Sequence, residues 1–367
     1  MSAPAGGRRF VRPGWGSRLL WVVYLAAAAV TAVAYLSPYT APGGLWPVAF
    51  AALAYPSLVA LLLLLSGYWL YRGRFGRAAL GPIVVALGYT HLRALVGLGG
   101  GAAASPDATP VAFVSYNLLG GKTFRGLEGA ALDTRAGELA GCLEADVLAV
   151  QESPRYEVVA DAVRDALAAD GLGYAYRPGS PAIALYARYP LLRPAVVEQF
   201  NSLNGILRAD MVVTPDDTVR LLVAHLESNR VRLDASQVAR EVAKADPQAY
   251  RTVRGVAANY RLGARRRGIQ SAVVTAEVAA SPYPVVLLGD LNDVPLSYTL
   301  GELRRGGLVD AFREAGSGLG VTYEGSIPGL RIDFVMATPQ LAPVAASVLD
   351  CDFSDHRPTR AVLAVGD

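Results

Sequence analysis

Hydrophobic positions are concentrated in the first third of the chain, where they form an almost unbroken run. Residues 19–71 contain no charged side chain. Such a run needs an apolar medium to cover it, and about 20 apolar residues span the hydrocarbon core of a bilayer. A stretch that contains proline and glycine, residues 37–44, divides the run. The pattern therefore predicts two membrane-spanning helices, near residues 19–36 and 45–71.

A third apolar segment covers residues 78–98 and predicts a third span, although it contains His91 and Arg93. We favour an arrangement in which Arg93 extends its charged end to the nearby membrane surface, as long basic side chains do. The alternative is a functional pair of the two residues within the membrane, because ionisable groups at that depth commonly serve a function. Residues 101–109 are mostly small and predict a linker.

Beyond the linker, short runs of apolar and β-branched residues alternate with helical stretches, such as residues 133–143 and 156–170. The runs predict strands at residues 110–116, 146–151, 182–186, 219–225, 284–289, 331–336 and 360–365. Strands that alternate with helices indicate an α/β domain whose sheets are covered on the outside. The predicted organisation is a membrane anchor at residues 1–100 with three transmembrane helices, the linker, and one α/β domain at residues 110–367.

The composition agrees with this division. Hydrophobic residues make up 53% of the 367 residues and charged residues 18%, compared with about 25% charged residues in soluble domains. The first 106 residues contain eight arginines and no lysine or acidic residue, so the remaining 26 basic residues face all 31 acidic ones. The α/β domain thus has a net charge of −5, which is not the strongly basic balance of a nucleic-acid-binding domain.

The arginines also predict the orientation of the anchor. Four of them precede the first span, three lie between the second and third spans, and the first connection has no charge. Because positively charged loops stay in the cytoplasm, the N-terminus and the second connection are predicted there. Three crossings then place the α/β domain outside the cytoplasmic membrane. If the first segment were instead a cleaved signal peptide, the two remaining spans would still export the domain.

Polar side chains that can bind metals or move protons follow the predicted strands. They are Asn117, Glu152, His225, Asp290, Asn292, Asp333, Asp355 and His356. Asp and Asn are common in turns, so one such strand end would mean little. Six strand ends of this kind predict a single site at one rim of the sheets. Both histidines of the domain belong to the set, which favours catalysis over a structural role.

The residue types predict metal-assisted attack on phosphorus. Glu152 and Asp355 are hard oxygen ligands, with Asn117 as an amide supplement, and a set without cysteine suits Mg²⁺ or Mn²⁺ better than zinc. Asp290 and Asn292 are two residues apart on a segment predicted to be extended, which would direct both side chains to the same side. The carboxylate can orient or deprotonate a water molecule while the amide holds a phosphate oxygen.

The two histidines complete the predicted site. Asp333 can hold the His356 ring in one tautomer and one orientation. His225 can donate hydrogen bonds to phosphoryl oxygens or protonate the leaving group. A metal ion and an imidazolium together would neutralise the charge that develops in the transition state.

Six short motifs surround these residues. They are VSYN at 114–117, VQES at 150–153, VAHLES at 223–228, LLGDLND at 287–293, RIDFVM at 331–336 and SDHRP at 354–358. In this order they resemble the endonuclease/exonuclease/phosphatase superfamily, whose members have the DNase I-like fold. The resemblance covers essentially residues 110–366. It implies a four-layered α/β sandwich, with two packed mixed sheets flanked by helices, and hydrolysis of a phosphodiester or phosphomonoester.

The same resemblance implies a divalent metal site, and the sequence leaves open whether it holds one metal ion or two. It identifies Glu152 with the metal carboxylate and Asn117 and Asp355 with residues that assist it. Most acidic residues between Asn117 and Glu152 fall in a predicted helix, which argues against a second metal site.

The resemblance also assigns the catalytic residues. Asp290 and Asn292 correspond to the pair at the water and the phosphate. Asp333 corresponds to the residue that orients His356, and His225 to a second catalytic histidine. Two histidines resemble the nuclease and sphingomyelinase-like branches more than the abasic-site repair branch.

The anchor and the charge together suggest the substrate class. A phosphohydrolase held at a membrane has a high effective concentration there, which favours a phospholipid or a lipid-linked phosphate at the outer face of the cytoplasmic membrane. An extracytoplasmic nuclease is the alternative, and the net charge of −5 argues against it because phosphate neutralisation drives nucleic-acid binding. A scaffold that had lost its chemistry would be expected to lack some candidate residues, yet all are present.

Two further features allow more than one interpretation. The connection between His225 and Asp290 is long and basic. It contains Arg251, Arg254, Arg261, Arg265, Arg266 and Arg267. We favour a solvated helix face over a cover that contacts anionic lipid head groups or substrate phosphates. Cys142 and Cys351 would lie in a compartment that permits a disulfide, but two unpaired buried thiols are the favoured interpretation.

Overall fold

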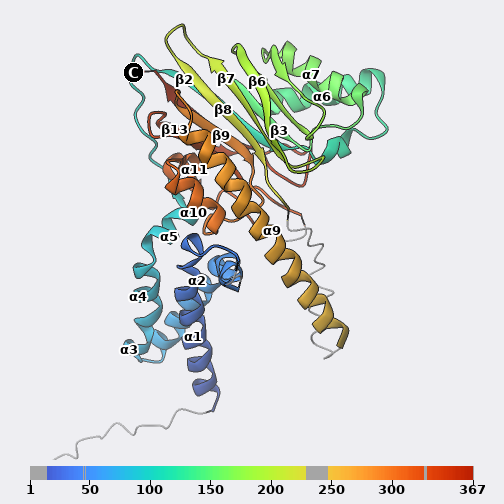
Figure 1. Cartoon of the computed structure of the whole chain (residues 1–367). Coiled ribbons are helices and arrows are strands. Elements are labelled where there is room, and N and C mark those ends of the chain that lie inside the picture. The colour runs from blue at the N-terminus through green and yellow to red at the C-terminus, as the bar shows by residue number, and fades with distance from the viewer. Residues whose placement is uncertain (1–14, 44, 46, 229–246, 326–328, 367) are drawn as a thin grey trace, which may run out of the picture.

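The computed structural model describes residues 15–43, 45, 47–228, 247–325 and 329–366, with the backbone alone at residues 247–253 and 256 (Figure 1). The chain begins with two long helices, α1 (Trp15–Ala34) and α2 (Pro47–Tyr71). A short 3-10 helix, η1 (Ser37–Tyr39), lies in the connection between them. Both long helices are apolar enough to cross a membrane, and they pack side by side through Tyr24 and Leu62.

The third apolar segment differs from the predicted continuous span. It forms three short helices, α3 (Phe75–Ala78), α4 (Leu80–Leu87) and α5 (Tyr89–Leu95), and the axis bends by 69° between α4 and α5. Gly88 occupies the bend, where a Cβ atom would collide with the ring of Tyr35. The bend therefore follows from a glycine against which an aromatic side chain packs.

His91 and Arg93 of α5 bind protein groups. The His91 Nε2 atom lies 3.1 Å from the carbonyl oxygen of Tyr35. The Arg93 guanidinium donates to the carbonyls of Val96 and Arg313, at 3.2 and 3.4 Å. Arg93 thus connects the anchor to the α/β domain, which neither the membrane-surface interpretation nor the intramembrane pair anticipates.

Two six-stranded sheets form the centre of the α/β domain. The first has the order β10, β12, β9, β8, β7, β6, and the second β13, β14, β2, β3, β5, β4. The first comprises β10 (Val309–Asp310), β12 (Asp333–Ala337), β9 (Val285–Asp290), β8 (Thr218–His225), β7 (Gly205–Val212) and β6 (Leu191–Gln199). The second comprises β13 (Pro343–Val348), β14 (Thr359–Val365), β2 (Thr109–Asn117), β3 (Val147–Gln151), β5 (Ile183–Ala187) and β4 (Tyr174–Tyr176). Both sheets are mixed, because β8 and β9 are parallel, β2 and β3 are parallel, and the other neighbours are antiparallel.

Helices cover the outer face of each sheet. Helices α6 (Gly129–Leu143) and α7 (Glu157–Ala169) lie on the second sheet. Helices α9 (Pro247–Ala279) and α10 (Tyr298–Arg305) lie on the first. Alternate residues of one strand serve two cores: Phe113 of β2 packs between the sheets, whereas Val114 packs against the helices. This is the predicted four-layered α/β sandwich, and the predicted fold class is confirmed.

The sequence pattern located some strands better than others. All seven predicted strands and both predicted helices occur, with ends shifted by a few residues. Strands β4, β6, β7 and β13 were not predicted. Strand β6 is half-exposed along its length, and β7 carries Arg208 and Asp210, so neither forms a continuous apolar run. Asp210 is nevertheless buried, because Arg220 of the neighbouring strand pairs with it at 2.8 Å.

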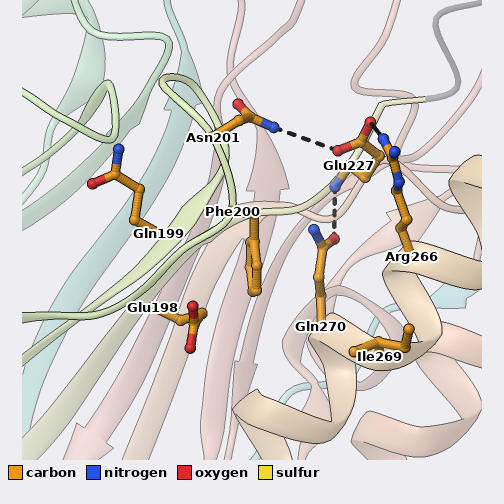
Figure 2. A pocket seen from close by; sticks show the side chains of 8 residues that line it. All are labelled: Glu198, Gln199, Phe200, Asn201, Glu227, Arg266, Ile269 and Gln270. Atoms are coloured by element: carbon orange, nitrogen blue, oxygen red, sulfur yellow. Dashed lines mark hydrogen bonds and ion pairs between the residues drawn. The ribbon is translucent and has the colours of Figure 1, made fainter.

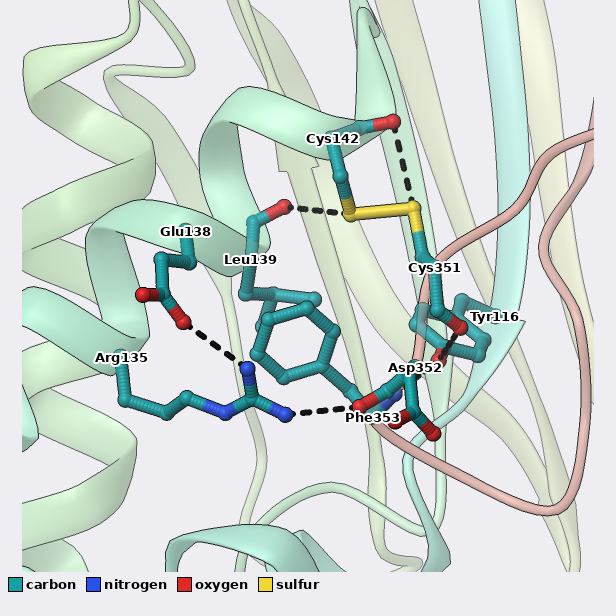
Figure 3. Close-up of a disulfide and its surroundings, with 8 residues drawn as sticks. All are labelled: Tyr116, Arg135, Glu138, Leu139, Cys142, Cys351, Asp352 and Phe353. Carbon is teal, nitrogen blue, oxygen red and sulfur yellow. Dashed lines mark hydrogen bonds and ion pairs between the residues drawn. A yellow bond between two sulfur atoms is a disulfide. The ribbon is translucent and has the colours of Figure 1, made fainter.

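The two cysteines are joined, so the predicted pair of unpaired thiols is wrong (Figure 3). The disulfide links Cys142 in the last turn of α6 to Cys351 in the loop before β14, with the Cα atoms 6.0 Å apart. A sequence separation of 209 residues conceals this proximity. Tyr116 fixes the same loop, because its hydroxyl donates to the Cys351 carbonyl and accepts the Phe353 N–H.

The anchor and the α/β domain share a hydrophobic cluster. Tyr55 of α2 and Ala94 of α5 pack with Val294 and Leu296 from the loop after β9. Hydrogen bonds follow the same boundary: Arg331 donates to the Ala94 carbonyl at 2.7 Å. The predicted linker, residues 101–109, is itself tied to the domain, because the Ala102 N–H donates to the Pro343 carbonyl at 2.9 Å. Just before it, β1 (Gly97–Leu98) pairs with β11 (Ser317–Gly318). The α/β domain is therefore in direct contact with the C-terminal ends of α1 and α5 and with the N-terminal part of α2.

Candidate active site

Strand register places three candidate residues side by side. His225 ends β8 and is the register partner of Asp290, which ends the parallel strand β9. Asp333 begins the antiparallel strand β12 and is the partner of Asp290 on the other side. A row of histidine and two carboxylates therefore crosses one edge of the first sheet. All three side chains are at most 2% exposed.

Asp290 is the centre of this row. Its Oδ2 atom accepts a hydrogen bond of 2.9 Å from Nδ2 of Asn117, which ends β2 of the opposite sheet. The same oxygen lies 3.7 Å from Nε2 of His225 and 3.9 Å from Nε2 of His356. Both sheets therefore contribute side chains to one carboxylate oxygen.

His356 is oriented by Asp333. Its Nδ1 atom lies 2.9 Å from Oδ2 of Asp333, and its Nε2 atom faces Asp290. The hydroxyl of Thr322 accepts the N–H groups of Ile332 and Asp333, which fixes the start of β12. The ring of Tyr323 lies edge-on to the imidazole, with centroids 4.9 Å apart.

Charge and burial shift the pKa values of this pair. Burial raises the pKa of Asp333 to about 6 although the His356 charge opposes the shift. Burial lowers the pKa of His356, but the charges of Asp333 and Asp290 outweigh it and raise the pKa to about 10. Near neutral pH the pair is therefore an imidazolium bound to a carboxylate.

His225 is held from its other nitrogen. Its Nδ1 atom lies 3.1 Å from the Leu203 carbonyl, which can only accept, so Nδ1 carries a proton. Its Nε2 atom is buried and finds no hydrogen-bond partner within the described part of the chain. The same is true of Oδ1 of Asp333. Buried polar atoms are rarely left unpaired, so these two atoms mark where a ligand or water would bind.

Asn292 departs from its predicted geometry. Strand β9 ends at Asp290, and Asn292 has a left-handed backbone with φ of 52°. Its N–H donates to Oδ1 of Asp290 at 2.9 Å, and its Nδ2 donates to the Leu226 carbonyl at 3.1 Å. The prediction of an extended segment is therefore wrong, because a tight turn forms directly after the strand. The turn instead gives Asp290 a second hydrogen bond.

The predicted metal residues lie around this centre without forming one cluster. Glu152 follows β3, and its Oε1 atom is 3.4 Å from Nδ2 of Asn117. The Asn117 Oδ1 atom accepts the Leu119 N–H at 3.0 Å, so Asn117 presents nitrogen, not the predicted oxygen, to the carboxylates. Asp355 is half-buried, 3.4 Å from the Ser354 hydroxyl.

The donor chemistry nevertheless fits a hard cation. Among the residues that the structure describes, one group of acidic and histidine side chains could hold a metal ion. It consists of Asp290, Asp333 and His356, whose ligand atoms all lie within 4.8 Å of one another. Glu152 and Asp355 lie outside this group, and neither forms an ion pair with a described basic residue. Half-buried carboxylates without a counter-ion favour a bound Mg²⁺ or Mn²⁺.

Two hollows flank the site. One of about 600 Å³ begins at Glu227, two residues beyond His225 (Figure 2). Figure 2 shows Arg266 and Asn201 directed at the Glu227 carboxylate, at 2.7 and 3.5 Å. The other, of about 300 Å³, is lined by Ser153, next to Glu152, and by Leu203. Both hollows therefore lie next to residues of the site and border the loop that contains Asn201 and Leu203.

Arg267 of α9 is not on a solvated face, contrary to the favoured interpretation of the basic connection. It is fully buried, its Nε atom lies 3.0 Å from Oδ2 of Asp293, and its Nη1 donates to the Glu227 carbonyl. Arg254, Arg261, Arg265 and Arg266 are exposed, whereas the side chain of Arg251 lies outside the described residues. Sequence analysis also missed Leu203 and Thr322, which support the site from loops without a motif.

Comparison with known proteins was made by family and by structure. The model of the Endonuclease/Exonuclease/phosphatase family matches residues 114–356, a range that includes all eight candidate residues. The model of a Domain of unknown function (DUF8431) matches residues 17–95. No curated protein matches the chain.

Several solved structures are similar. An endonuclease/exonuclease/phosphatase from Beutenbergia cavernae DSM 12333 is 19% identical over 70% of this chain and 72% of that chain, with a TM-score of 0.47. Sphingomyelinase C from Streptomyces griseocarneus is 18% identical over 69% and 99%, with a TM-score of 0.42. Humanized TDP2 from D. rerio, with 14 mutations, is 17% identical over 69% and 98%, with a TM-score of 0.46.

Proposed function

Because the chain belongs to the Endonuclease/Exonuclease/phosphatase family, we propose that it is a divalent-metal-dependent phosphoesterase that uses activated water. One observation carries this proposal: the buried Asp290 carboxylate lies between His225 and His356, and His356 is charged by Asp333. A base between two imidazoles suits water attack on a phosphate ester, since one group must accept a proton and others must offset negative charge.

The proposed reaction uses each side chain in one role. Asp290 takes a proton from water while the water oxygen bonds to phosphorus. The bond from phosphorus to the leaving oxygen breaks, and this oxygen receives a proton from Nε2 of His225, which enters the step as an imidazolium and leaves it as a neutral ring with its proton on Nδ1. The His356 imidazolium offsets charge on the phosphoryl oxygens, and the Asn292 turn holds Asp290 in position.

Glu152 and Asp355 are proposed to hold the metal ion, with Asn117 beside them. Bound Mg²⁺ or Mn²⁺ would supply positive charge to the phosphoryl oxygens. Asn117 donates to both Glu152 and Asp290. It therefore couples the proposed metal carboxylate to the proposed base.

The proposed substrate is a phospholipid or lipid-linked phosphate at the outer face of the cytoplasmic membrane. Helices α1 and α2 are long and apolar enough to span a bilayer, and the site domain packs directly against them. The disulfide supports placement outside the cytoplasm, because disulfides persist in oxidising compartments. The arginines around the spans support the same orientation. An extracytoplasmic nuclease is the alternative function.

The test is phosphate-ester turnover by the full-length protein in detergent or liposomes, with Mg²⁺ and with chelator. A phospholipid panel, DNA and a generic diester are compared for the native protein, His356→Ala and Arg164→Gln. Arg164 is an exposed residue of α7 that pairs with Asp161, so its variant is the matched control. Metal-dependent head-group release that His356→Ala abolishes supports the proposal. DNA cleavage without lipid turnover favours the nuclease, and no turnover of any substrate contradicts both.

A further inference from the structure

A cavity lies where the anchor helices meet the α/β domain. Its volume is about 240 Å³. Tyr39 of η1 and His91 of α5 line it from the anchor. Arg304 and Arg305 of α10, with Arg313 of α11 (Ala311–Ala315), line it from the domain. This junction cavity is separate from the Asp290 site, none of whose residues line it.

The junction cavity has an excess of positive charge. Arg304 forms no ion pair with any acidic residue that the structure describes, and its Nε atom is buried without a hydrogen bond. One nitrogen of its guanidinium donates to the Pro295 carbonyl at 2.6 Å. Burial lowers the pKa of Arg304 to about 10, although the charge of Asp310 opposes the shift. Arg304 is half-buried, and a partly desolvated guanidinium without a counter-ion is costly, so an anion at this position would be favoured.

The neighbouring acidic groups are already engaged. Asp310 forms a bidentate pair with Arg331, with oxygens 2.8 and 3.0 Å from Nη1. Glu302 pairs with Arg305. The Nε atom of Arg313 is buried without a hydrogen bond, and its nearest described carboxylate oxygen, on Glu314, is 3.4 Å away. Arg304 therefore lines the cavity without an ion pair to any described residue, and Arg313 lines it with one ion pair, to Glu314, that forms no hydrogen bond at Nε.

The cavity lies at the level where lipid head groups would be found if α1 and α2 span a bilayer. Helix α1 ends at Ala34 and α2 begins at Pro47, so η1 between them lies at the membrane surface. Tyr39 of η1 is 69% exposed, and the Arg305 guanidinium lies 5.6 Å from its ring centroid. Exposed tyrosines next to basic side chains are typical of this interfacial zone.

We propose that the junction cavity binds a phosphate-bearing anion through Arg304 and Arg313, as an anionic phospholipid head group at the membrane surface would present it. Phosphate oxygens accept several N–H donors at once, which suits two guanidinium groups that converge on a small volume. The site is distinct from the proposed hydrolysis at Asp290. A bound lipid would also bridge the anchor and the domain, since the cavity is lined by both.

The test measures thermal unfolding of the delipidated full-length protein in uncharged detergent. Phosphatidylglycerol, phosphatidylcholine and inorganic phosphate are titrated separately into the native protein, Arg304→Gln, Arg313→Gln and the control Arg164→Gln. Phosphatidylglycerol is expected to raise the melting temperature where phosphatidylcholine does not. Loss of either arginine is expected to raise the half-saturating concentration at least about tenfold, as for a charged hydrogen bond, and the control is expected to match the native protein.

The outcomes separate the possible anion sources. An equal shift with inorganic phosphate that both cavity variants lose identifies free phosphate as the ligand, whereas a shift with lipid alone identifies the head group. No shift with either anion, or a shift that survives in both variants, overturns the proposal. Arg304→Gln also removes a half-buried charge that has no counter-ion, so without anion it is expected to be at least as stable as the native protein. Since no turnover is measured, the result does not depend on the hydrolysis proposed above.

Discussion

At the scale of single residues, the site combines one buried carboxylate, Asp290, with two differently held imidazoles. His225 is fixed by a backbone carbonyl at Nδ1, which directs its Nε2 atom toward Asp290. His356 is fixed by a carboxylate, which keeps it charged. In the proposed reaction the two rings therefore have different tasks: His225 donates a proton, whereas His356 keeps a positive charge beside Asp290.

The role of the Asp333 charge can be tested by Asp333→Asn. The asparagine side chain can still accept a hydrogen bond from Nδ1 of His356, so the imidazole ring should keep its orientation. The ring loses the negative charge that keeps it protonated. We expect kcat to fall about 10²- to 10⁴-fold, in the range of acid–base contributions, with a small change in KM. Steady-state kinetics with the identified substrate measure this effect.

Asp161→Asn is the matched control for this substitution, because Asp161 is an exposed aspartate of α7 paired with Arg164. Its kcat should equal that of the native protein. A folded Asp333→Asn protein with kcat within threefold of the native value would show that the His356 charge is unimportant.

At the scale of elements, α9 is attached to the first sheet by one buried ion pair. Arg267 reaches Asp293 just beyond β9, and Thr299 at the start of α10 donates to the same carboxylate at 2.8 Å. The Arg267 guanidinium also binds the carbonyl of Glu227, which lines the larger hollow. The helix, the strand end and the hollow therefore depend on one side chain.

Arg267→Gln should destabilise the protein by about 3–5 kcal/mol, because it leaves Asp293 buried without its partner. Arg265→Gln, on the exposed face of the same helix, should change the stability by less than about 0.5 kcal/mol. Denaturant unfolding of the two variants compares them directly. Equal effects would mean that Arg267 does not carry the attachment of α9.

The disulfide is a second connection between elements, and it bears on the site. It ties the end of α6 to the loop that leads to His356 within five residues. We expect the double variant Cys142→Ser, Cys351→Ser to lose about 2–5 kcal/mol of stability and part of its kcat. Melting temperature and turnover of the variant should match those of the native protein under reducing agent. A native protein whose melting temperature is insensitive to reduction would contradict this expectation.

The sequence predicted elements whose signal is local and missed those that depend on distant contacts. The strands that end in Asn117, His225 and Asp290 are continuous apolar runs followed by polar motifs, so pattern and resemblance both identify them. Arg267 carries the same charge as its exposed neighbours, and its burial depends on Asp293, which is 26 residues away. The Asn292 turn was missed because a period of two was extended beyond the end of the strand.

At the scale of the whole molecule, the anchor is part of the structure that positions the site. Ala94 accepts a hydrogen bond from Arg331, which lies two residues before Asp333. The Pro38 carbonyl accepts a hydrogen bond from Arg305, and the Ala49 carbonyl accepts one from the hydroxyl of Tyr260 of α9. Contacts thus reach from the end of the apolar helices to the start of β12 and to α9 and α10, the helices that cover the candidate-site sheet, which would hold the site at a fixed height above a bilayer.

That arrangement requires the α/β domain to lie on the side opposite the Arg-rich connection between α2 and α4. Single cysteines at Gly76 and Ser105 test the orientation, because both positions are exposed and a Cβ atom at Gly76 would meet no other atom within 4 Å. A membrane-impermeant maleimide applied to intact cells should label Ser105→Cys and spare Gly76→Cys. Both should react after the membrane is permeabilised, which controls for reactivity. Labelling of Gly76→Cys alone in intact cells would place the domain in the cytoplasm and exclude an outer-leaflet substrate.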